Sequence, residues 1–390
     1  MSTADPTWLA DPTAYGAALA QELRRDVYDR WRGVHHATTE EHIAHDAELI
    51  AALNAGDWNR YGWPEATGGL GGDILHRAAY YDALAAADLP TPEPTLMQET
   101  LAPALMHFAP HLAEAFLPAA LAGQEWWGQG FSEPAAGSDL ASLRCRARRE
   151  DDHWVISGQK LWTTHGSTAS RLVCLARTGT TESRHRGLSM IMIDADAPGV
   201  SIRPVAIASG YNELAEVFFD DVRVPLDRLV GEENGGWAVA MYLLQFERSM
   251  YAWQSGGVAL RQLRRLRAEL ATGHPNKAPD GVVSRLGALY ADIVTVRARS
   301  SRTLRRLASG QTIGPEASVD KVALARVETE LHDLARDVHG ADFVFGTDPS
   351  LTSWREDWWF SRSATILGGS SEVQRTIIAD HVLGLPKEPS

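Results

Sequence analysis

Residues 216–237, EVFFDDVRVPLDRLVGEENGGW, mark the change of pattern that decides the fold. The first half alternates apolar and polar side chains and ends at Val224-Pro225, which is typical of a strand that stops at a turn. The Gly-rich segment 231–237 follows, and a long helical pattern begins directly after it. The stretch therefore predicts a junction between a β region and a helical region.

The chain on both sides of this junction supports a three-part organisation. Residues 12–122 carry apolar side chains at three- and four-residue spacing, which predicts helices, and short alternating segments from about residue 125 predict a small antiparallel β domain. After the junction, four long helical patterns with short connections predict an antiparallel bundle: 238–271, 281–309, 315–339 and 354–384. The expected fold class is α+β and mostly α, with a helical domain over 1–124, a middle β domain over 125–236 and a four-helix bundle over 237–390.

Composition indicates a soluble globular protein. Hydrophobic residues make up 44% of the 390 residues and charged residues 22%. Lys+Arg 37 against Asp+Glu 50 gives a net charge of −13, which argues against nonspecific binding to nucleic acid or to an anionic membrane. Cys145 and Cys174 lack paired spacing, and neither a signal-like start nor an apolar stretch of about 18 residues occurs. We therefore expect a cytoplasmic protein.

Several common site motifs are absent. The sequence has no Gly-rich nucleotide-binding fingerprint, no phosphate-binding loop, no nucleophile elbow and no H-E-x-x-H motif. His42 and His45 are three residues apart on a predicted helix, but no third ligand accompanies them, so we predict no metal site.

Two segments of the β region carry more chemistry than composition requires. QGFSEPAAGSD (129–139) is a strand that leads into a loop of small residues, whose backbone can approach a ligand closely. GQKLWTT (158–164) is a strand that ends in an indole and two hydroxyls, which suits a flat heteroaromatic cofactor. Taken alone, the first segment is more often a tight turn and the second a packed strand end.

Together and in this order, the two segments resemble the acyl-CoA dehydrogenase family. The resemblance covers most of the chain, and the further matching segments are GWPEATGGLGG (62–72), the junction (216–237), FERSMYAWQSGG (246–257) and SSEVQRTIIADHVLGLP (370–386). It implies the same three-part fold, FAD as cofactor and an acyl-CoA or other acyl-thioester substrate. It also implies an electron-transferring flavoprotein as electron acceptor and a homo- or hetero-oligomer of two or four subunits.

The same resemblance assigns residues to the cofactor and the substrate. The flavin would lie between β domain and bundle, and residues of the two β segments would contact it, whereas C-terminal residues would hold the adenosine part of FAD. The assigned cofactor residues are Gln129, Phe131, Ser132, Trp162, Thr163, Thr164, Gly340, Ser370 and Glu372. The assigned substrate residues are Ser138, Arg248 and Gly368.

The expected reaction needs a base that removes the α-proton of the thioester. Many family members place a Glu where this chain has Gly368, and glycine has no proton acceptor. A second group in the family places the Glu on the first bundle helix, before an Arg, and Glu247-Arg248 matches that position. Although a helical Glu is more often a solvated surface carboxylate, the motif register and the glycine at 368 favour Glu247 as the base.

Some predictions stay open at the level of sequence. An Arg-x-x-Phe-Gly segment that many relatives use on a neighbouring subunit's FAD is absent from 261–290, and Asp337-Val338-His339-Gly340-Ala341 replaces their Gln-x-x-Gly-Gly. The alternatives are a flavin monooxygenase or oxidase on the same fold, or a non-catalytic subunit of a hetero-oligomer. Glu247 argues against a monooxygenase, which needs no α-proton base, and Glu247 together with the two flavin segments argues against a non-catalytic subunit. The acyl group is not predictable, because the pocket depends on how side chains such as Met97, Tyr242, Tyr251 and Leu367 are placed.

Overall fold

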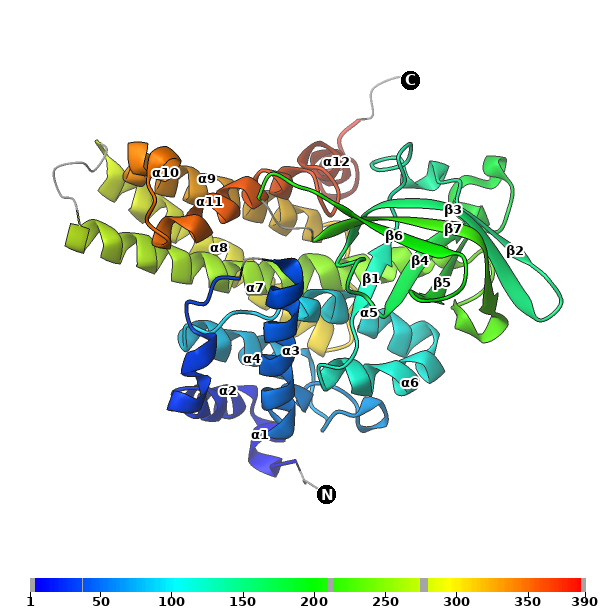
Figure 1. Cartoon of the computed structure of the whole chain (residues 1–390), viewed down its shortest axis with the longest axis horizontal. Helices are drawn as coiled ribbons and strands as arrows, with labels where there is room; N and C mark the ends of the chain where they lie inside the picture. Colours follow the sequence, from blue (N-terminus) through cyan, green and yellow to red (C-terminus); the bar gives the residue numbers. More distant parts are fainter. Residues whose placement is uncertain (1–3, 37, 210–212, 274–279, 387–390) are drawn as a thin grey trace.

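The computed structural model describes residues 4–36, 38–209, 213–273 and 280–386. Figure 1 shows the N-terminal helices below, the β domain at the right and the helical bundle above, with the long helix α7 running between them. Residues 274–279, part of the segment that stands where relatives carry Arg-x-x-Phe-Gly, lie outside the described residues.

The N-terminal region consists of helices whose starts are set by local sequence. Asp5 and Asp11 accept hydrogen bonds from the backbone N–H groups of Thr7 and Thr13, each at 2.8 Å, and a proline follows each Asp at the first helical position. The helices are α1 (Pro6–Ala10), α2 (Pro12–Glu22), α3 (Thr39–Ala55), α4 (Ile74–Ala86), α5 (Pro94–Phe108) and α6 (Pro110–Leu121).

The middle region is one twisted sheet with the strand order β6-β7-β3-β2-β4-β5-β8. The predicted final strand is β7, whose inward side chains Ala215, Val217 and Phe219 are buried. The strands are β1 (Trp127–Gly130), β2 (Arg146–Arg149), β3 (His153–Thr164), β4 (Arg171–Arg177), β5 (Leu188–Asp194), β6 (Val200–Val205), β7 (Leu214–Pro225) and β8 (Leu229–Val230). The prediction of a purely antiparallel sheet is wrong at β4, which pairs in parallel with both β1 and β2.

The C-terminal bundle is formed by α7 (Gly236–Gly273), α8 (Val282–Ala308), α9 (Ala317–His339) and α11 (Ser350–Ser361), with the short α10 (Ala341–Phe345) between the last two. The predicted continuous helix over 354–384 is wrong, because the chain leaves the helix after α11 and re-enters it at α12 (Ser371–Ile377). Gly368 and Gly369 have φ of +64° and +90°, which no right-handed helix contains. The resulting turn lies beside α7 and α9.

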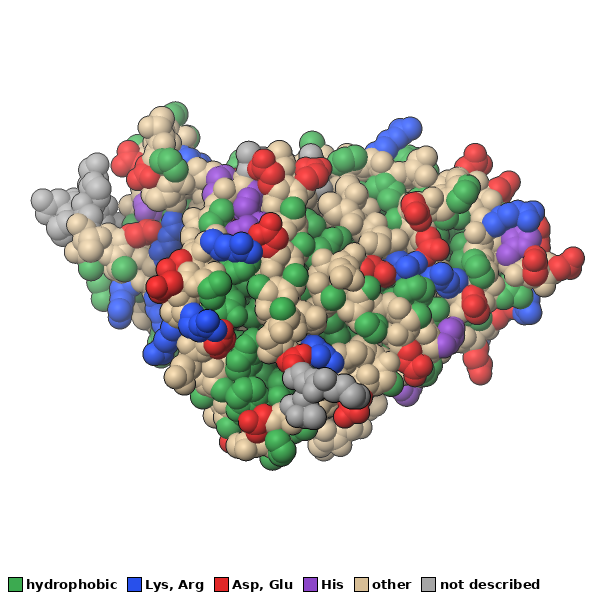
Figure 2. All heavy atoms as spheres, turned by 60° about the horizontal axis from the view of Figure 1, so that its bottom comes forward, with side chains coloured by type: hydrophobic (Ala, Val, Ile, Leu, Met, Phe, Trp, Pro, Cys, Tyr) green, Lys and Arg blue, Asp and Glu red, His purple; other side chains and the backbone are tan. Residues whose placement is uncertain are grey.

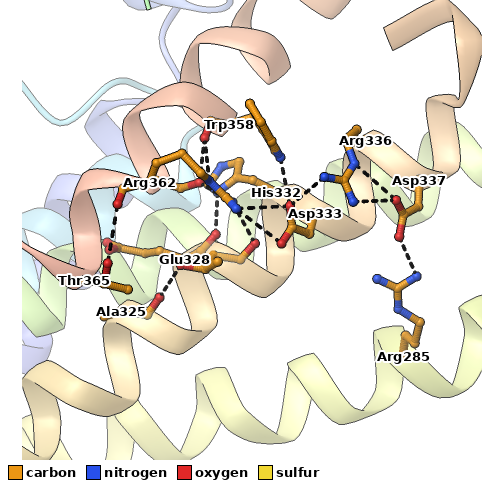
Figure 3. Close-up of polar contacts among 12 residues, drawn as sticks. Arg285, Ala325, Glu328, His332, Asp333, Arg336, Asp337, Trp358, Arg362 and Thr365 are labelled. Carbon is orange, nitrogen blue, oxygen red and sulfur yellow. Dashed lines mark hydrogen bonds and ion pairs between the residues drawn. The ribbon is translucent and has the colours of Figure 1, made fainter. Parts of the chain in front are cut away.

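Polar contacts hold α11 on α9 and so position this turn (Figure 3). The Trp358 indole N–H donates to Asp333 at 2.8 Å, and the Arg362 guanidinium lies 3.3 Å from the same carboxylate. Arg362 also donates to the Thr329 carbonyl at 3.2 Å. Because these contacts join the end of α11 to the middle of α9, the segment that follows Arg362 starts from a defined place.

The surface shows no large area of positive charge on the face drawn in Figure 2, where acidic and basic side chains are interspersed. Among the described residues, no helix combines the length and the apolar character that a membrane crossing requires. No group of three His, Cys, Asp or Glu side chains with metal-binding geometry occurs in the described parts of the chain.

Candidate active site

The two β segments singled out in the sequence lie against one another. The backbone N–H of Leu161 donates to the Ser132 carbonyl at 2.9 Å. The Lys160 ammonium, which is fully buried, donates to the Phe131 carbonyl at 3.1 Å and to the Glu133 carboxylate at 2.8 Å. A buried ion pair with additional hydrogen bonds therefore sets the position of the loop relative to the end of β3.

The end of β3 has unusual geometry for a strand. Trp162 has φ of +62°, a conformation that costs a bulky residue free energy, and its indole is 52% exposed. The neighbouring Thr163 hydroxyl and His165 Nδ1 are buried without a hydrogen-bond partner. An exposed indole beside two unsatisfied polar atoms is a surface that a planar, hydrogen-bonding ring would complete.

This arrangement fits the flavin of FAD. Thr163 and His165 would supply polar contacts, and Trp162 a stacking surface, while Thr164 and Ser132 are partly exposed at the same place. Gln129 lies on β1 opposite Val173 of β4 and is also partly exposed. The fit rests on the Thr163 hydroxyl and His165 Nδ1, which have no hydrogen-bond partner among the described residues.

The second part of the site is the turn between α11 and α12. The Lys321 ammonium donates to the Ala364 carbonyl at 2.5 Å, and the Gln374 side-chain amide lies 3.4 Å from the Gly368 carbonyl. The Ser370 hydroxyl accepts a hydrogen bond from the Val373 N–H at 3.3 Å and caps α12. These contacts tie the turn to α9 and α12.

Glu247 reaches this turn from α7. A Cβ added to Gly368 would lie 2.8 Å from Glu247 Oε1, so the carboxylate occupies the space that a side chain at 368 would need. Burial raises the pKa of the Glu247 carboxyl, and the nearby Arg248 and Lys321 cations oppose that rise. Glu247 as a whole residue is nevertheless partly exposed.

Arg248 points to a further unmet interaction. Its Nε is buried and has no hydrogen-bond partner among the described residues, and burial lowers the pKa of its guanidinium. A guanidinium with an unsatisfied Nε beside Glu247 is a suitable contact for a hydrogen-bond acceptor on a ligand.

Three further predicted residues, Ser138, Gly340 and Glu372, are exposed. Ser138 is exposed, in a loop whose Asp139 pairs with Arg184 at 2.6 Å. Gly340 is exposed where α9 ends, and Glu372 is exposed on α12. Their assignments to acyl-CoA and FAD stay predictions.

The comparison with known proteins now identifies the family. Three family models match in succession: the N-terminal domain of acyl-CoA dehydrogenases over residues 16–124, the middle domain over 128–222 and the C-terminal domain over 234–383. The chain belongs to the acyl-CoA dehydrogenase family and is an enzyme of that class.

The similar proteins add detail of their own. The acyl-CoA dehydrogenase IpdE1 of Mycobacterium tuberculosis is 37% identical over 382 residues, which cover 98% of this chain and 96% of that protein. The solved Tcur3481-Tcur3483 steroid ACAD has a TM-score of 0.82 at 26% identity, with 100% of both chains covered. The ChsE4-ChsE5 complex of Mycobacterium tuberculosis has a TM-score of 0.79 at 28% identity, again over 100% of both chains.

Some residues of the site could not be recognised from the sequence. Lys160 and Glu133 lie in the two quoted segments, but only the fold shows that they form one buried pair. Lys321 and Glu328 on α9 resemble ordinary charges of an amphipathic helix, although their seven-residue spacing places them on one face.

Proposed function

We propose that this enzyme is an FAD-dependent dehydrogenase that converts an acyl-CoA, or another acyl thioester, into its trans-2-enoyl form, with Glu247 as the base for the α-proton. The observation that carries the proposal is the contact between Glu247 and the Gly368 position, where a Cβ would lie 2.8 Å from Oε1. The family places its base at one of these two positions. Because the Glu247 carboxylate fills the space at position 368, it can reach the same α-carbon as a base at position 368 would.

The environment of Glu247 supports its role. A carboxylate is a weak base in water, and removal of an α-proton requires a base whose pKa is closer to the working pH. Burial raises the pKa of Glu247, and the nearby Arg248 and Lys321 cations oppose that rise. Glu247 would take the α-proton as the C–H bond breaks, and the carboxyl would then hold that proton until product leaves.

Trp162 and Thr163 would hold FAD, whose N5 atom would accept the β-hydride. The chain's own contribution is to orient the thioester between this surface and Glu247 and to exclude water from the recess. Electron-transferring flavoprotein is the proposed acceptor of the electrons.

The names of similar proteins suggest the kind of substrate and assembly. One solved relative is described as a steroid ACAD, and we propose a cyclic acyl group for this enzyme too. Two solved relatives are named as pairs of proteins, which supports assembly with a second copy or with a related subunit.

The test is the substitution Glu247→Gln, which retains the size of the side chain and removes the base. We expect the purified variant to keep its bound FAD and to lose anaerobic flavin bleaching by acyl-CoA by at least about 100-fold, the range of general-base contributions. Glu330→Gln, on the exposed face of α9, is the matched control and should bleach at the wild-type rate. Undiminished bleaching in Glu247→Gln would refute the assignment.

The same preparation separates the alternative reaction classes. An oxidase or monooxygenase would consume oxygen at a rate comparable to the reduction of an artificial electron acceptor. A non-catalytic subunit would fail to bleach with any acyl-CoA. We expect acceptor reduction with little oxygen consumption.

A further inference from the structure

A polar stripe continues from Glu247 into the bundle. Tyr251 and Ser255 follow Glu247 at four and eight residues along α7, so the three side chains lie on one face of the helix. Glu328 of α9 faces them, with its Oε1 3.4 Å from the Tyr251 hydroxyl and a side-chain hydrogen bond to Ser255. Lys321 lies within electrostatic range of both Glu247 and Glu328.

This stripe is not a complete hydrogen-bond network. An ionised carboxylate offers about four acceptor positions, and Tyr251 and Ser255 fill two of those of Glu328. The Tyr251–Glu328 separation of 3.4 Å is also longer than the usual 2.7–2.8 Å of an O–H···O bond. The two oxygens are thus loosely paired, and Glu328 keeps acceptor positions that Tyr251 and Ser255 do not fill.

The stripe is not fully enclosed. Tyr251, Ser255 and Glu328 are each partly exposed, as Glu247 is, although all three lie between α7 and α9. Burial raises the pKa of Glu328 to about 7, with Lys321 opposing the rise. A wholly hydrocarbon acyl group in contact with this carboxyl would deprive it of water without replacing the lost hydrogen bonds, which is unfavourable.

A second carboxyl approaches from the β domain. Glu213, just before β7, interacts electrostatically with Tyr251, and burial raises its pKa to about 8. The backbone N–H of His165 donates to the backbone carbonyl of Glu213 at 2.6 Å, so Glu213 lies beside the end of β3. The polar groups that act on Tyr251 therefore come from two regions of the fold.

We propose that Tyr251 and Glu328 recognise a hydroxyl group on the acyl part of the substrate, about one helical turn beyond the carbon that Glu247 deprotonates. The proposal rests on the proposed dehydrogenation, since Glu247 marks the α-carbon. Residues four apart on a helix are separated by about 6 Å along its axis, a distance that a hydroxyl on the far side of a six-membered ring spans together with its own hydrogen bond of about 2.8 Å. A hydroxyl can donate to an unfilled acceptor position of Glu328 and can accept from Tyr251 once the Tyr251 O–H turns from Glu328 toward it, whereas a ketone only accepts and an ammonium only donates.

The experiment compares two probes that differ in one oxygen: cyclohexane-1-carbonyl-CoA and 4-hydroxycyclohexane-1-carbonyl-CoA, the latter as both isomers. Dissociation constants are measured by calorimetry on the FAD-loaded Glu247→Gln enzyme, because binding to it needs no turnover. We expect one hydroxy isomer to bind about 10- to 100-fold more tightly than the unsubstituted ring, the range for a hydrogen bond to a charged group.

Two further substitutions, each added to Glu247→Gln, test the residues themselves. Tyr251→Phe removes one oxygen, and Glu328→Leu removes the carboxyl while filling most of its volume, so each should bring the ratio of dissociation constants close to one without weakening binding of the unsubstituted ring. Glu330→Leu is the matched control on the exposed face of α9 and should leave the ratio unchanged. FAD content and thermal unfolding verify that each variant is folded.

The outcomes are distinct from those of the base assignment. Equal binding of the two probes, or a preference that survives both Tyr251→Phe and Glu328→Leu, would overturn the proposed hydroxyl recognition. Bleaching that persists in Glu247→Gln would overturn the base instead, and it would leave the binding comparison readable.

Discussion

Replacement of Gly368 by alanine is the sharpest test of the active-site geometry. The added methyl would lie 2.8 Å from Glu247 Oε1 and 3.4 Å from the Lys321 side chain. Ordinary van der Waals separation is about 3.5 Å or more, so the carboxylate must move by roughly half an ångström or more. The backbone φ of +64° adds a cost of about 1–2 kcal/mol for a residue with a Cβ.

The expected consequence is loss of rate rather than loss of fold. A misplacement of about 1 Å in a reacting group can reduce turnover by about 100-fold, so we expect Gly368→Ala to slow flavin bleaching by about 10- to 100-fold. The assay is anaerobic stopped-flow bleaching with a saturating acyl-CoA, together with FAD content and thermal unfolding.

The matched control is Gly310→Ala. Gly310 has φ of +75° and no atom within 4 Å of an added Cβ, so the variant carries the same backbone cost without the contact. It should lose stability as Gly368→Ala does and bleach at the wild-type rate. If Gly368→Ala also bleaches at that rate, the carboxylate does not act from the place described here.

Three further predictions concern charge. The bleaching rate should rise with pH along a one-proton limb whose midpoint lies above 4.5, because Glu247 acts ionised and its pKa is raised; a rate that falls with rising pH would contradict this. Glu133→Leu leaves the Lys160 ammonium buried without its counter-charge and should lower the free energy of unfolding by about 3–5 kcal/mol in denaturant titrations, whereas the exposed-site control Glu232→Leu should change it little. Glu328→Gln should raise the free energy of unfolding at pH 8.5 by up to about 3 kcal/mol and change it little at pH 4. The reason is that the native state raises the Glu328 pKa from 4.5 to about 7, which favours the native state below pH 4.5, and this contribution is lost as the pH rises through 7. Equal effects at both pH values would refute this reasoning.

The order of helical, β and helical regions could be predicted from periodicity, and the structure confirms it. The continuous helix over 354–384 could not be corrected from pattern alone, because helical spacing resumes beyond the turn and only the positive φ of Gly368 and Gly369 separates the two parts. The parallel pairing of β4 with β1 and β2 could not be predicted either. Alternation along a strand indicates which side chains face the core, but it does not indicate which strands pair with it.

At the site, the motif register led to Glu247 and Gly368, which the structure brings into contact. Glu328 was missed because the sequence around it, with Glu330 two residues on, is that of a solvated helix. Its position opposite Tyr251 depends on how α9 packs against α7. Periodicity in one sequence shows which face of a helix is apolar, but it does not show which distant helix packs against that face.

The hydrophobic cores have a consequence for how this chain can be divided. Met250 of α7 and Leu304 of α8 belong to the core of the N-terminal helices, while Val239 and Leu243 of α7 share a core with α5, α6 and the sheet. The three regions that the family models delimit are thus units of sequence but not autonomous modules. A fragment that ends at residue 230 would expose apolar faces that α7 normally covers. A chimera that exchanges one region between relatives must therefore also exchange the α7 and α8 residues that pack into the core of that region.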